Sequence, residues 1–244
     1  LFECTGYNIC QPEVIVRGKL IVLEGLDGSG KSTQAEILAK TLAGRGIVAR
    51  RIKLPNYDDP SSSLVKMYLD GRFGKDPGDV NVYAASSFFA VDRYASYNCY
   101  WKNDYLNGTM IISDRYTTSN ACHQAIKLPR ERWGEYLEWL EDYEYQKIGI
   151  PKPDLVIYLD MPVEVSQHLL SSRYHGDEVK KDIHEKNLEY LKQCSLAADF
   201  ACESLGWVRV PCAKDGIPMP IEEISGYINR IVFNAFDPAE YRKG

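Results

Sequence analysis

Short apolar runs alternate with longer amphipathic stretches through most of the chain. The apolar runs predict strands, and the amphipathic stretches between them repeat with the period of a helix. Strands are expected at 19–24, 48–54, 109–113, 154–160 and 207–211. Helices are expected at 31–43, 64–69, 80–106, 163–172 and 179–205, with further helical segments up to about Lys147 and a last helix ending near Val232. Strands that alternate with helices form parallel sheets covered on both faces, so the pattern predicts an α/β fold around a five-stranded parallel sheet.

Chain length and composition favour one folded domain. The chain has 244 residues, of which 45% are hydrophobic and 26% charged, a balance that can bury a full core and gives no sign of disorder. We expect this domain to span residues 19–235. Residues 1–18 lack the basic start and apolar middle of a signal peptide, and we expect an N-terminal extension of vector, processed or truncated origin. Residues 236–244 are expected to form a C-terminal tail.

Charge and cysteine usage argue against several classes of protein. The formal net charge is −5 and no long basic run is present, which argues against a nucleic-acid-binding protein. No apolar run approaches the roughly 18 residues that a membrane span needs. The 7 cysteines lie far apart without metal-ligand spacing, so we expect free, mostly buried thiols in a reducing, cytoplasmic environment.

The segment Gly25–Ser32, with the sequence GLDGSGKS, has the spacing of a phosphate-binding loop. It lies between a predicted strand and a predicted helix, where backbone N–H groups and the helix dipole attract anions. We expect Lys31 to reach the terminal phosphates of ATP and Ser32 to bind Mg²⁺. The residues expected around these phosphates are Gly25, Asp27, Gly28, Ser29, Gly30, Lys31, Ser32 and Thr33. No N-K-x-D motif for guanine is present, which disfavours a GTPase.

Three further groups of residues carry candidate chemistry. Asp27 would repel phosphates, so it faces a sugar hydroxyl or a cation, or it is a solvated loop residue. Phe89 and Arg93 share a helix face, where a ring and a guanidinium can recognise a base; the alternative is a core Phe beside a surface Arg. Asp114 and Arg115 follow the third strand, where the carboxylate can hold Mg²⁺ through water and the guanidinium can hold a phosphate. A structural salt bridge is the alternative for Arg115.

Several segments together resemble the thymidylate kinase family. They are EGLDGSGKSTQ (24–34), LPNY (54–57), FFAVDR (88–93), SDRYTTSNACHQ (113–124), PKPDLVIYLDMPVEVS (151–166) and WVRVPCA (207–213). The combination of the phosphate loop with the DRYxxS block is specific to that family, and the resemblance extends over about residues 19–235. It implies a P-loop kinase fold with a lid segment, ATP with Mg²⁺ as phosphoryl donor, dTMP as acceptor, dTDP as product, and usually a homodimer.

The resemblance also implies roles for single residues. Asp27 would hydrogen-bond the 3′-hydroxyl of dTMP, and Arg115 would hold its phosphate. Phe89 would stack on thymine while Arg93 bonds a carbonyl of the base. The full set expected around the acceptor is Asp27, Tyr57 near the phosphate, Phe89, Arg93, Arg115, Ser119, His123 and, near the pyrimidine, Gln124.

Two positions depart from the family pattern. His123 stands where the family commonly has Tyr or Phe against the sugar, which puts the discrimination of deoxyribose from ribose in doubt. Gly28 stands where one branch has Arg, so the lid must supply the catalytic charge. The lid offers Arg173, Lys180 and Lys181, and Arg173 is the expected catalytic residue because it directly leaves the helix after the fourth strand.

The expected reaction moves the γ-phosphoryl group of ATP onto dTMP, with Lys31, Arg115 and Arg173 as catalytic cations. No general base is needed, because the accepting phosphate is already an anion. Two alternatives remain: a related P-loop kinase for dUMP, a nucleoside or another small acceptor, and a nucleotide-binding regulatory protein without turnover. Only His123 and the small number of lid arginines support the second. A motor or transport ATPase would need insertions that are not visible.

Overall fold

A parallel sheet lies at the centre of the molecule, and its strands match the apolar runs of the sequence. The computed structural model describes residues 17–173 and 188–237. The sheet has the strand order β2-β3-β1-β4-β5. Its strands are β1 Leu20–Glu24, β2 Ala49–Lys53, β3 Met110–Asp114, β4 Leu155–Asp160 and β5 Val208–Pro211, and every neighbouring pair is parallel. The predicted five-stranded α/β fold is confirmed.

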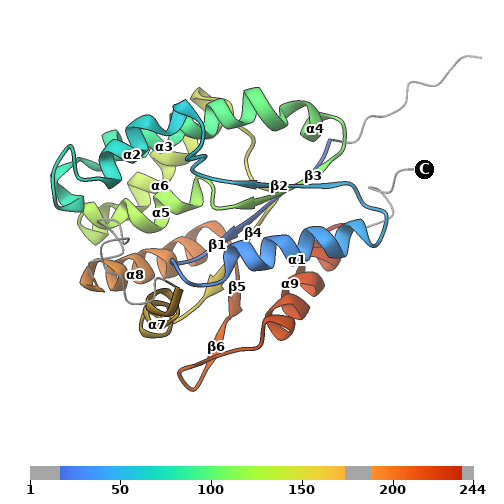
Figure 1. Cartoon of the computed structure of the whole chain (residues 1–244). Coiled ribbons are helices and arrows are strands. Elements are labelled where there is room, and N and C mark those ends of the chain that lie inside the picture. The colour runs from blue at the N-terminus through green and yellow to red at the C-terminus, as the bar shows by residue number, and fades with distance from the viewer. Residues whose placement is uncertain (1–16, 174–187, 238–244) are drawn as a thin grey trace, which may run out of the picture.

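Helices cover both faces of this sheet (Figure 1). One face packs against α1 (Lys31–Ala43) and α9 (Ile221–Ala235). The other face is covered by α3 (Val82–Ser96), α5 (Thr118–His123), α6 (Trp133–Glu141) and α8 (Leu188–Leu205). The remaining α-helices of the described ranges are α2 (Ser63–Leu69), α4 (Lys102–Leu106) and α7 (Val163–Arg173), and short 3₁₀ helices lie at Pro60–Ser62, Pro77–Asp79, Ala125–Lys127 and Arg130–Arg132.

Alternation of side chains along β1 explains the two layers of core. Ile21 and Leu23 pack among the side chains of α1 and α9, whereas Leu20 and Val22 pack against the aromatic rings of segment 97–105. Successive residues of a strand face opposite sides of the sheet, so a continuous apolar run is what a sheet buried on both faces requires. All four side chains have 0% exposure, and each such burial contributes about 1.5–3 kcal/mol.

The helix expected at 80–106 contains a change of helical type. It consists of α3, a π-helical turn at Tyr97–Trp101 (η3), and α4. The rings of Tyr97 and Trp101, both buried, lie with their centroids 4.7 Å apart. A second π-helical turn, η6 (Asp142–Lys147), follows α6. Such single wide turns leave the hydrophobic period almost unchanged, which is why the sequence does not reveal them.

The hairpin before α9 was not predicted, and part of the helix expected at 179–205 lies outside the described residues. A two-stranded hairpin of β6 (Ala213–Lys214) and β7 (Ile217–Pro218) precedes α9 and was not predicted, because each strand is only 2 residues long. The expected helix at 179–205 is described from Leu188 onward, as α8. Its first residues, with Lys180 and Lys181, lie outside the described residues, as do most of the predicted extension at 1–18 and of the tail at 236–244.

Cysteine usage agrees with the expectation for free thiols. Of the cysteines in the described ranges, all are free, and Cys99 is exposed while Cys122, Cys194, Cys202 and Cys212 are buried. Cys4 and Cys10 lie outside these ranges. Within the same ranges, the helices are too short or too polar to cross a lipid bilayer.

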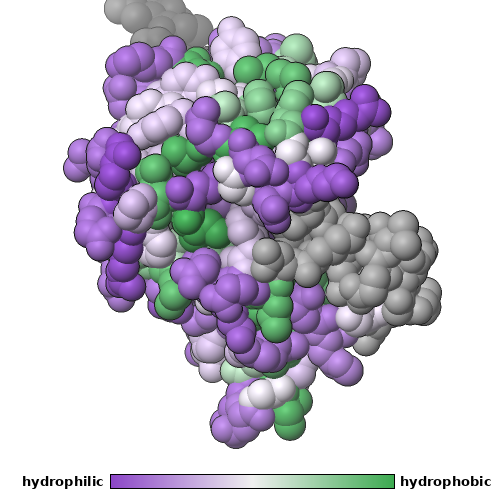
Figure 2. Space-filling model, turned by 90° about the vertical axis from the view of Figure 1, so that its left-hand side faces the viewer, coloured by the Kyte–Doolittle hydropathy of each residue, from purple (hydrophilic) through white to green (hydrophobic). Residues whose placement is uncertain are grey.

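The carboxyl ends of the strands meet at one edge of the sheet, which is the left side of Figure 1. There β1 leads into the phosphate loop, β3 ends at Asp114, and β2 is followed by the loop that carries Tyr57. Parallel strands therefore bring segments together that lie far apart in the chain. Seen from this side, hydrophobic side chains lie recessed between hydrophilic ones (Figure 2).

Candidate active site

The phosphate loop connects β1 to α1 and has the backbone conformation that an anion site requires. Gly28 has φ +85 and Gly30 has φ +89, in the left-handed region that residues with a Cβ rarely adopt. A Cβ on Gly28 would lie 2.6 Å from the carbonyl oxygen of Ser166 in α7, so this position also has no room for a side chain. Gly30 directly precedes α1, whose N-terminal N–H groups and dipole favour phosphate. The predicted position of the loop, between a strand and a helix N-terminus, is confirmed, and phosphate binding stays a prediction.

Lys31 lies inside the curl of this loop. Its Nζ donates hydrogen bonds to the carbonyl oxygens of Gly25 at 2.9 Å and Leu26 at 2.8 Å. Burial and the nearby charge of Arg115 lower the pKa of Lys31. An ammonium held by two neutral carbonyls can exchange them for phosphate oxygens, which are stronger, charged acceptors.

Ser32 and Asp114 come together at the edge of the loop. The Ser32 hydroxyl donates to Oδ2 of Asp114, while the buried Oδ1 has no hydrogen-bond partner within the described part of the chain. Beside them lies an open cavity of about 450 Å³ that Arg51 and Lys53 also line. A hydroxyl and a carboxylate with an unused oxygen are hard ligands of the kind that Mg²⁺ prefers together with substrate phosphates. Among the described residues, no cluster of three or more His, Cys, Asp or Glu side chains offers an all-protein metal site.

Arg115, the residue after β3, has a strained backbone. Its φ is +68, which for a residue with a side chain costs about 1–3 kcal/mol. Two hydrogen bonds hold this conformation: its N–H donates to the carbonyl of Leu23 at 3.1 Å, and its carbonyl accepts from the hydroxyl of Ser113. In this conformation the guanidinium of Arg115 lies beside Glu24 at the end of β1 and Asp27 in the phosphate loop.

The Arg115 guanidinium joins the loop to α5. Its Nη2 donates to Oδ1 of Asp27, and its Nη1 lies 3.4 Å from Oε1 of Glu24 and 3.2 Å from Oγ of Ser119. Burial alone would raise the pKa of Asp27, but the charges of Arg115 and Lys31 outweigh it and hold that pKa well below its usual value. The Asp27 carboxylate thus pairs with the Arg115 guanidinium, and its role towards a substrate stays a prediction.

His123, at the end of α5, completes this cluster. Its Nε2 lies 3.4 Å from Nη1 of Arg115, and its Nδ1 lies 3.5 Å from the sulfur of Cys194 in α8. Burial, followed by the charge of Arg115, lowers the pKa of His123 from 6.5 to about 4. The imidazole is therefore neutral near pH 7, and it borders the same space as Asp27 and Arg115.

Phe89 and Arg93 lie on α3 beside this cluster, but Arg93 is buried rather than at the surface. Its Nε donates to Oε2 of Glu144 at 2.7 Å, its Nη2 donates to Oε1, and its Nη1 donates to the carbonyl of Tyr116 at 3.3 Å. Phe89 packs edge-on against Tyr68 with centroids 6.2 Å apart. The two side chains thus have different partners, and Glu144 fixes the orientation of the guanidinium.

The remaining predicted acceptor residues differ in exposure. Gln124 is 1% exposed, and its buried Oε1 has no hydrogen-bond partner among the described residues. Tyr57 is 44% exposed in the loop after β2. Arg173, the predicted catalytic residue of the lid, is the last residue of α7, and its side chain lies outside the described part of the chain.

Comparison with known proteins agrees with this geometry. The family model described as thymidylate kinase matches residues 23–213. The chain belongs to the thymidylate kinase family. It is 35% identical over 182 residues to a probable thymidylate kinase of Thermococcus kodakarensis, covering 72% of this chain and 84% of that protein. It is 28% identical over 195 residues to a thymidylate kinase of Mycobacterium tuberculosis, covering 77% and 87%.

A solved structure of a thymidylate kinase from Candida albicans has the same fold. The TM-score is 0.65 at 24% identity, and the match covers 89% of this chain and 92% of that one. The identity is low, so this likeness supports the fold rather than the details of the site.

The thymidylate kinase motifs do not reveal every residue that builds this site. Glu24, Asn120 and Glu144 were not predicted, although each is nearly or wholly buried and polar. Asn120 donates from Nδ2 to Oε1 of Glu144 at 3.3 Å. For Glu24 one signal was present, because a charged residue closes an otherwise apolar strand. Glu144 lies in a polar helical stretch where no pattern distinguishes it from its neighbours.

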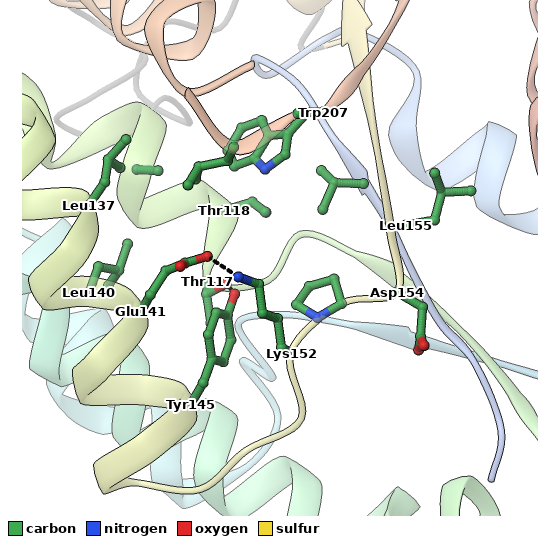
Figure 3. A pocket seen from close by; sticks show the side chains of 15 residues that line it. Thr117, Thr118, Leu137, Leu140, Glu141, Tyr145, Lys152, Asp154, Leu155 and Trp207 are labelled. Atoms are coloured by element: carbon green, nitrogen blue, oxygen red, sulfur yellow. Dashed lines mark hydrogen bonds and ion pairs between the residues drawn. The ribbon is translucent and has the colours of Figure 1, made fainter. Parts of the chain in front are cut away.

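A second cavity, of about 130 Å³, lies beside α5 and is lined by Thr118 and Ala121 of that helix (Figure 3). Thr117 and Thr118 line it, together with Lys152 and Glu141, which form an ion pair at 2.7 Å (Figure 3). None of the predicted site residues lines it. Its Thr118 wall is shared with the site, because the Thr118 hydroxyl donates to Glu24.

Proposed function

We propose that this member of the thymidylate kinase family transfers the γ-phosphoryl group of ATP to dTMP and releases dTDP and ADP. One observation supports the proposal above the others. The Arg115 guanidinium contacts Asp27 in the phosphate loop, where ATP is proposed to bind, and Ser119 and His123 on α5, where dTMP is proposed to bind. A cation in that place can stabilise the charge that develops between donor and acceptor phosphates.

On the donor side, the loop residues 25–33 would surround the β- and γ-phosphates of ATP with backbone N–H groups. Lys31 would give up its two loop carbonyls for phosphate oxygens. Ser32 would hold Mg²⁺ directly, and Asp114, with its unused Oδ1, would hold it directly or through water. Bound there, Mg²⁺ would neutralise phosphate charge as the reaction proceeds.

On the acceptor side, we place the base of dTMP at Phe89 and Arg93, which lie four residues apart on α3. Phe89 would stack on the thymine ring, and Arg93, whose orientation Glu144 fixes, would bond a carbonyl of the base. Gln124 would use its unpaired oxygen towards the pyrimidine. Tyr57 would contact the monophosphate from the exposed loop after β2.

The sugar and phosphate of dTMP would lie between these two sides. Asp27 would bond the 3′-hydroxyl, and Ser119 and Arg115 would line the path of the phosphate. His123 would face the sugar as a neutral ring, which is smaller than the Tyr or Phe that the resemblance leads one to expect. We therefore propose weaker rejection of a ribose 2′-hydroxyl than a larger ring would give.

The proposed chemistry is an in-line displacement. An oxygen of the dTMP phosphate attacks the γ-phosphorus, a P–O bond forms, and the bond to the β-phosphate oxygen breaks as ADP leaves with the electron pair. The attacking oxygen is already anionic, so no proton has to be removed. Lys31, Arg115 and, from the lid, Arg173 would spread the charge of the transition state.

We further propose a homodimer formed through the exposed face of α3. Val91 and Tyr94 are each 49% exposed and lie three residues apart on that helix, and Leu64 on α2 is 41% exposed. Exposed apolar side chains gathered on neighbouring helices favour association between copies of a chain. The proposed working unit is residues 19–235, acting on nucleotides in the cytoplasm without nucleic acid or membrane.

The test is a coupled assay of ADP release with ATP as donor and dTMP, dUMP, UMP, dCMP and thymidine as acceptors. The proposal predicts the highest kcat/KM for dTMP. It also predicts that the wild type discriminates less strongly against UMP than the His123→Tyr variant does. A preference for any other acceptor by tenfold or more, about 1.4 kcal/mol, would contradict the assignment to dTMP.

A further inference from the structure

Glu24 is a wholly buried carboxylate at the end of β1. It has 0% exposure, and it follows four apolar residues in the same strand. Its Oε1 accepts from the N–H of Gly25 at 2.9 Å, and its Oε2 accepts from the hydroxyls of Thr118 at 2.6 Å and Ser119 at 2.7 Å. Its hydrogen-bond donors therefore come from the start of the phosphate loop and from the start of α5.

Stability alone does not explain a charge at this position. Moving an ionised carboxylate out of water costs several kcal/mol, and well-packed apolar replacements of buried charges are often neutral or stabilising. The preceding residues, 20–23, show that the strand elsewhere fills its buried positions with apolar side chains. A buried charge among satisfied donors next to a catalytic cation is the arrangement expected of a functional site.

The two ends of the Arg115 guanidinium have different surroundings. Nη1 faces Glu24 and the ring of His123, which are both buried, and Ser119, which is partly exposed. Nη2 faces Asp27, whose side chain is 29% exposed, whereas that of Glu24 is 0% exposed. Because Asp27 is partly exposed and Glu24 is buried, we expect an entering phosphate to replace Asp27 on Nη2 rather than Glu24 on Nη1.

We propose that Glu24 is the positioning residue of Arg115: it anchors Nη1 while Nη2 exchanges Asp27 for a substrate phosphate. The proposal rests on the proposed phosphoryl transfer, in which Arg115 meets that phosphate. Asp27 thereby becomes free to turn to the acceptor sugar. One end of the guanidinium stays fixed through the cycle, which removes the need to reorganise it when charge develops.

The direct test is Glu24→Gln, which keeps the shape of the side chain but removes its charge. We expect kcat for dTMP to fall about 10–100-fold, by analogy with residues that orient the ligands of metal sites through a hydrogen bond. The KM values for ATP and dTMP should stay within about threefold. The thermal midpoint should fall, because an amide NH2 replaces one carboxylate oxygen that accepts hydrogen bonds, so kcat is expressed per folded enzyme. A kcat within twofold of the wild type would overturn the proposal, as would a kcat loss that simply follows a loss of folded protein.

Thr118→Val is the matched control. Thr118 and Ser119 donate to the same oxygen of Glu24, but only Ser119 also contacts Arg115. If Glu24 served only to hold the start of α5, Thr118→Val would lower kcat as strongly as Glu24→Gln. Positioning of Arg115 predicts that Thr118→Val keeps kcat within about threefold of the wild type.

A second readout separates this proposal from the proposed function. In ¹⁵N NMR spectra of the full chain, the Nε–H signal of Arg115, assigned by its absence in Arg115→Lys, reports how the guanidinium is held. With ATP and dTMP absent, Glu24→Gln should shift and broaden this signal, and Thr118→Val should leave it in place. An unchanged signal in Glu24→Gln would overturn the positioning role. Absence of dTMP turnover in the wild type would instead contradict the proposed function.

Discussion

Arg93 and Glu144 form a two-pronged ion pair that is closed off from solvent, with side-chain exposures of 3% and 0%. Removing one partner of such a pair leaves an uncompensated buried charge, which typically costs about 3–5 kcal/mol. Glu144→Ala should lower the free energy of unfolding by that amount, as measured by urea denaturation.

Glu135→Ala is the control for this measurement. Glu135 pairs with Arg132 at 2.8 Å, but its side chain is 60% exposed, so solvent can replace the partner. Its midpoint should not move measurably. If Glu144→Ala were as stable as Glu135→Ala, Arg93 would have found other partners in place of Glu144.

Gly28 and Gly46 offer a comparison of left-handed glycines with and without a close neighbour. Their φ values are +85 and +76, but a Cβ would collide with the Ser166 carbonyl at Gly28 and meet nothing within 4 Å at Gly46. Gly46→Ala should lose roughly 1–2 kcal/mol for conformation alone. Gly28→Ala should lose more, and it alone should weaken ATP binding measured by calorimetry. Similar losses, with ATP affinity intact in both, would contradict the close packing of the loop on α7.

His123 makes stability depend on pH in a defined window. Its pKa falls from 6.5 to about 4 on folding, so the unfolded chain takes up the proton first as the pH is lowered. Stability is therefore lost between about pH 6.5 and pH 4, by roughly 3 kcal/mol in total. His123→Gln and His123→Phe should both flatten the dependence of unfolding free energy on pH in this range. A slope unchanged in both variants would mean that another group causes it.

Asp27 affects stability in a different, lower pH range. Arg115 and Lys31 hold its pKa below the ordinary value of 3.8, so its stabilising effect is present above that value and is lost only as the pH falls further. Loss of stability above pH 4 is thus a property of His123 rather than of the Asp27 ion pair.

Arg115→Ala separates binding of ATP from its use. The side chain lies on the acceptor side of the loop, whereas the loop N–H groups and Lys31 remain. We expect kcat to fall by about 100-fold or more while the Kd for ATP changes little. Arg132→Ala, at an exposed ion pair at the start of α6, should have wild-type kinetics. A parallel loss of ATP affinity in Arg115→Ala would place this residue on the donor instead.

Local patterns carried most of the fold and part of the site. The strands followed from short apolar runs, and the phosphate loop followed from glycines at fixed spacing before a helix. Both depend on neighbours in sequence, so one segment suffices to predict them. The loop before α1 is the clearest case.

The sequence did not predict which carboxylates would pair with Arg93 and Arg115, because these partners lie far away in the chain. Arg93 and Glu144 are 51 residues apart, and Arg115 and Glu24 are 91 apart. Which carboxylate meets which guanidinium depends on the packing of α3 against η6 and on the strand order of the sheet, not on spacing along the chain. The same dependence hid the strained conformation of Arg115, since its φ is held by Leu23 and Ser113.

The central claim is tested most directly by following nucleotides chromatographically after ATP, Mg²⁺ and dTMP are mixed with the full chain. The account predicts that dTDP and ADP appear in equal amounts, and that Lys31→Ala, which removes the cation of the phosphate loop, abolishes both. ADP without dTDP, or dTDP formation at the same rate in Lys31→Ala, would contradict it.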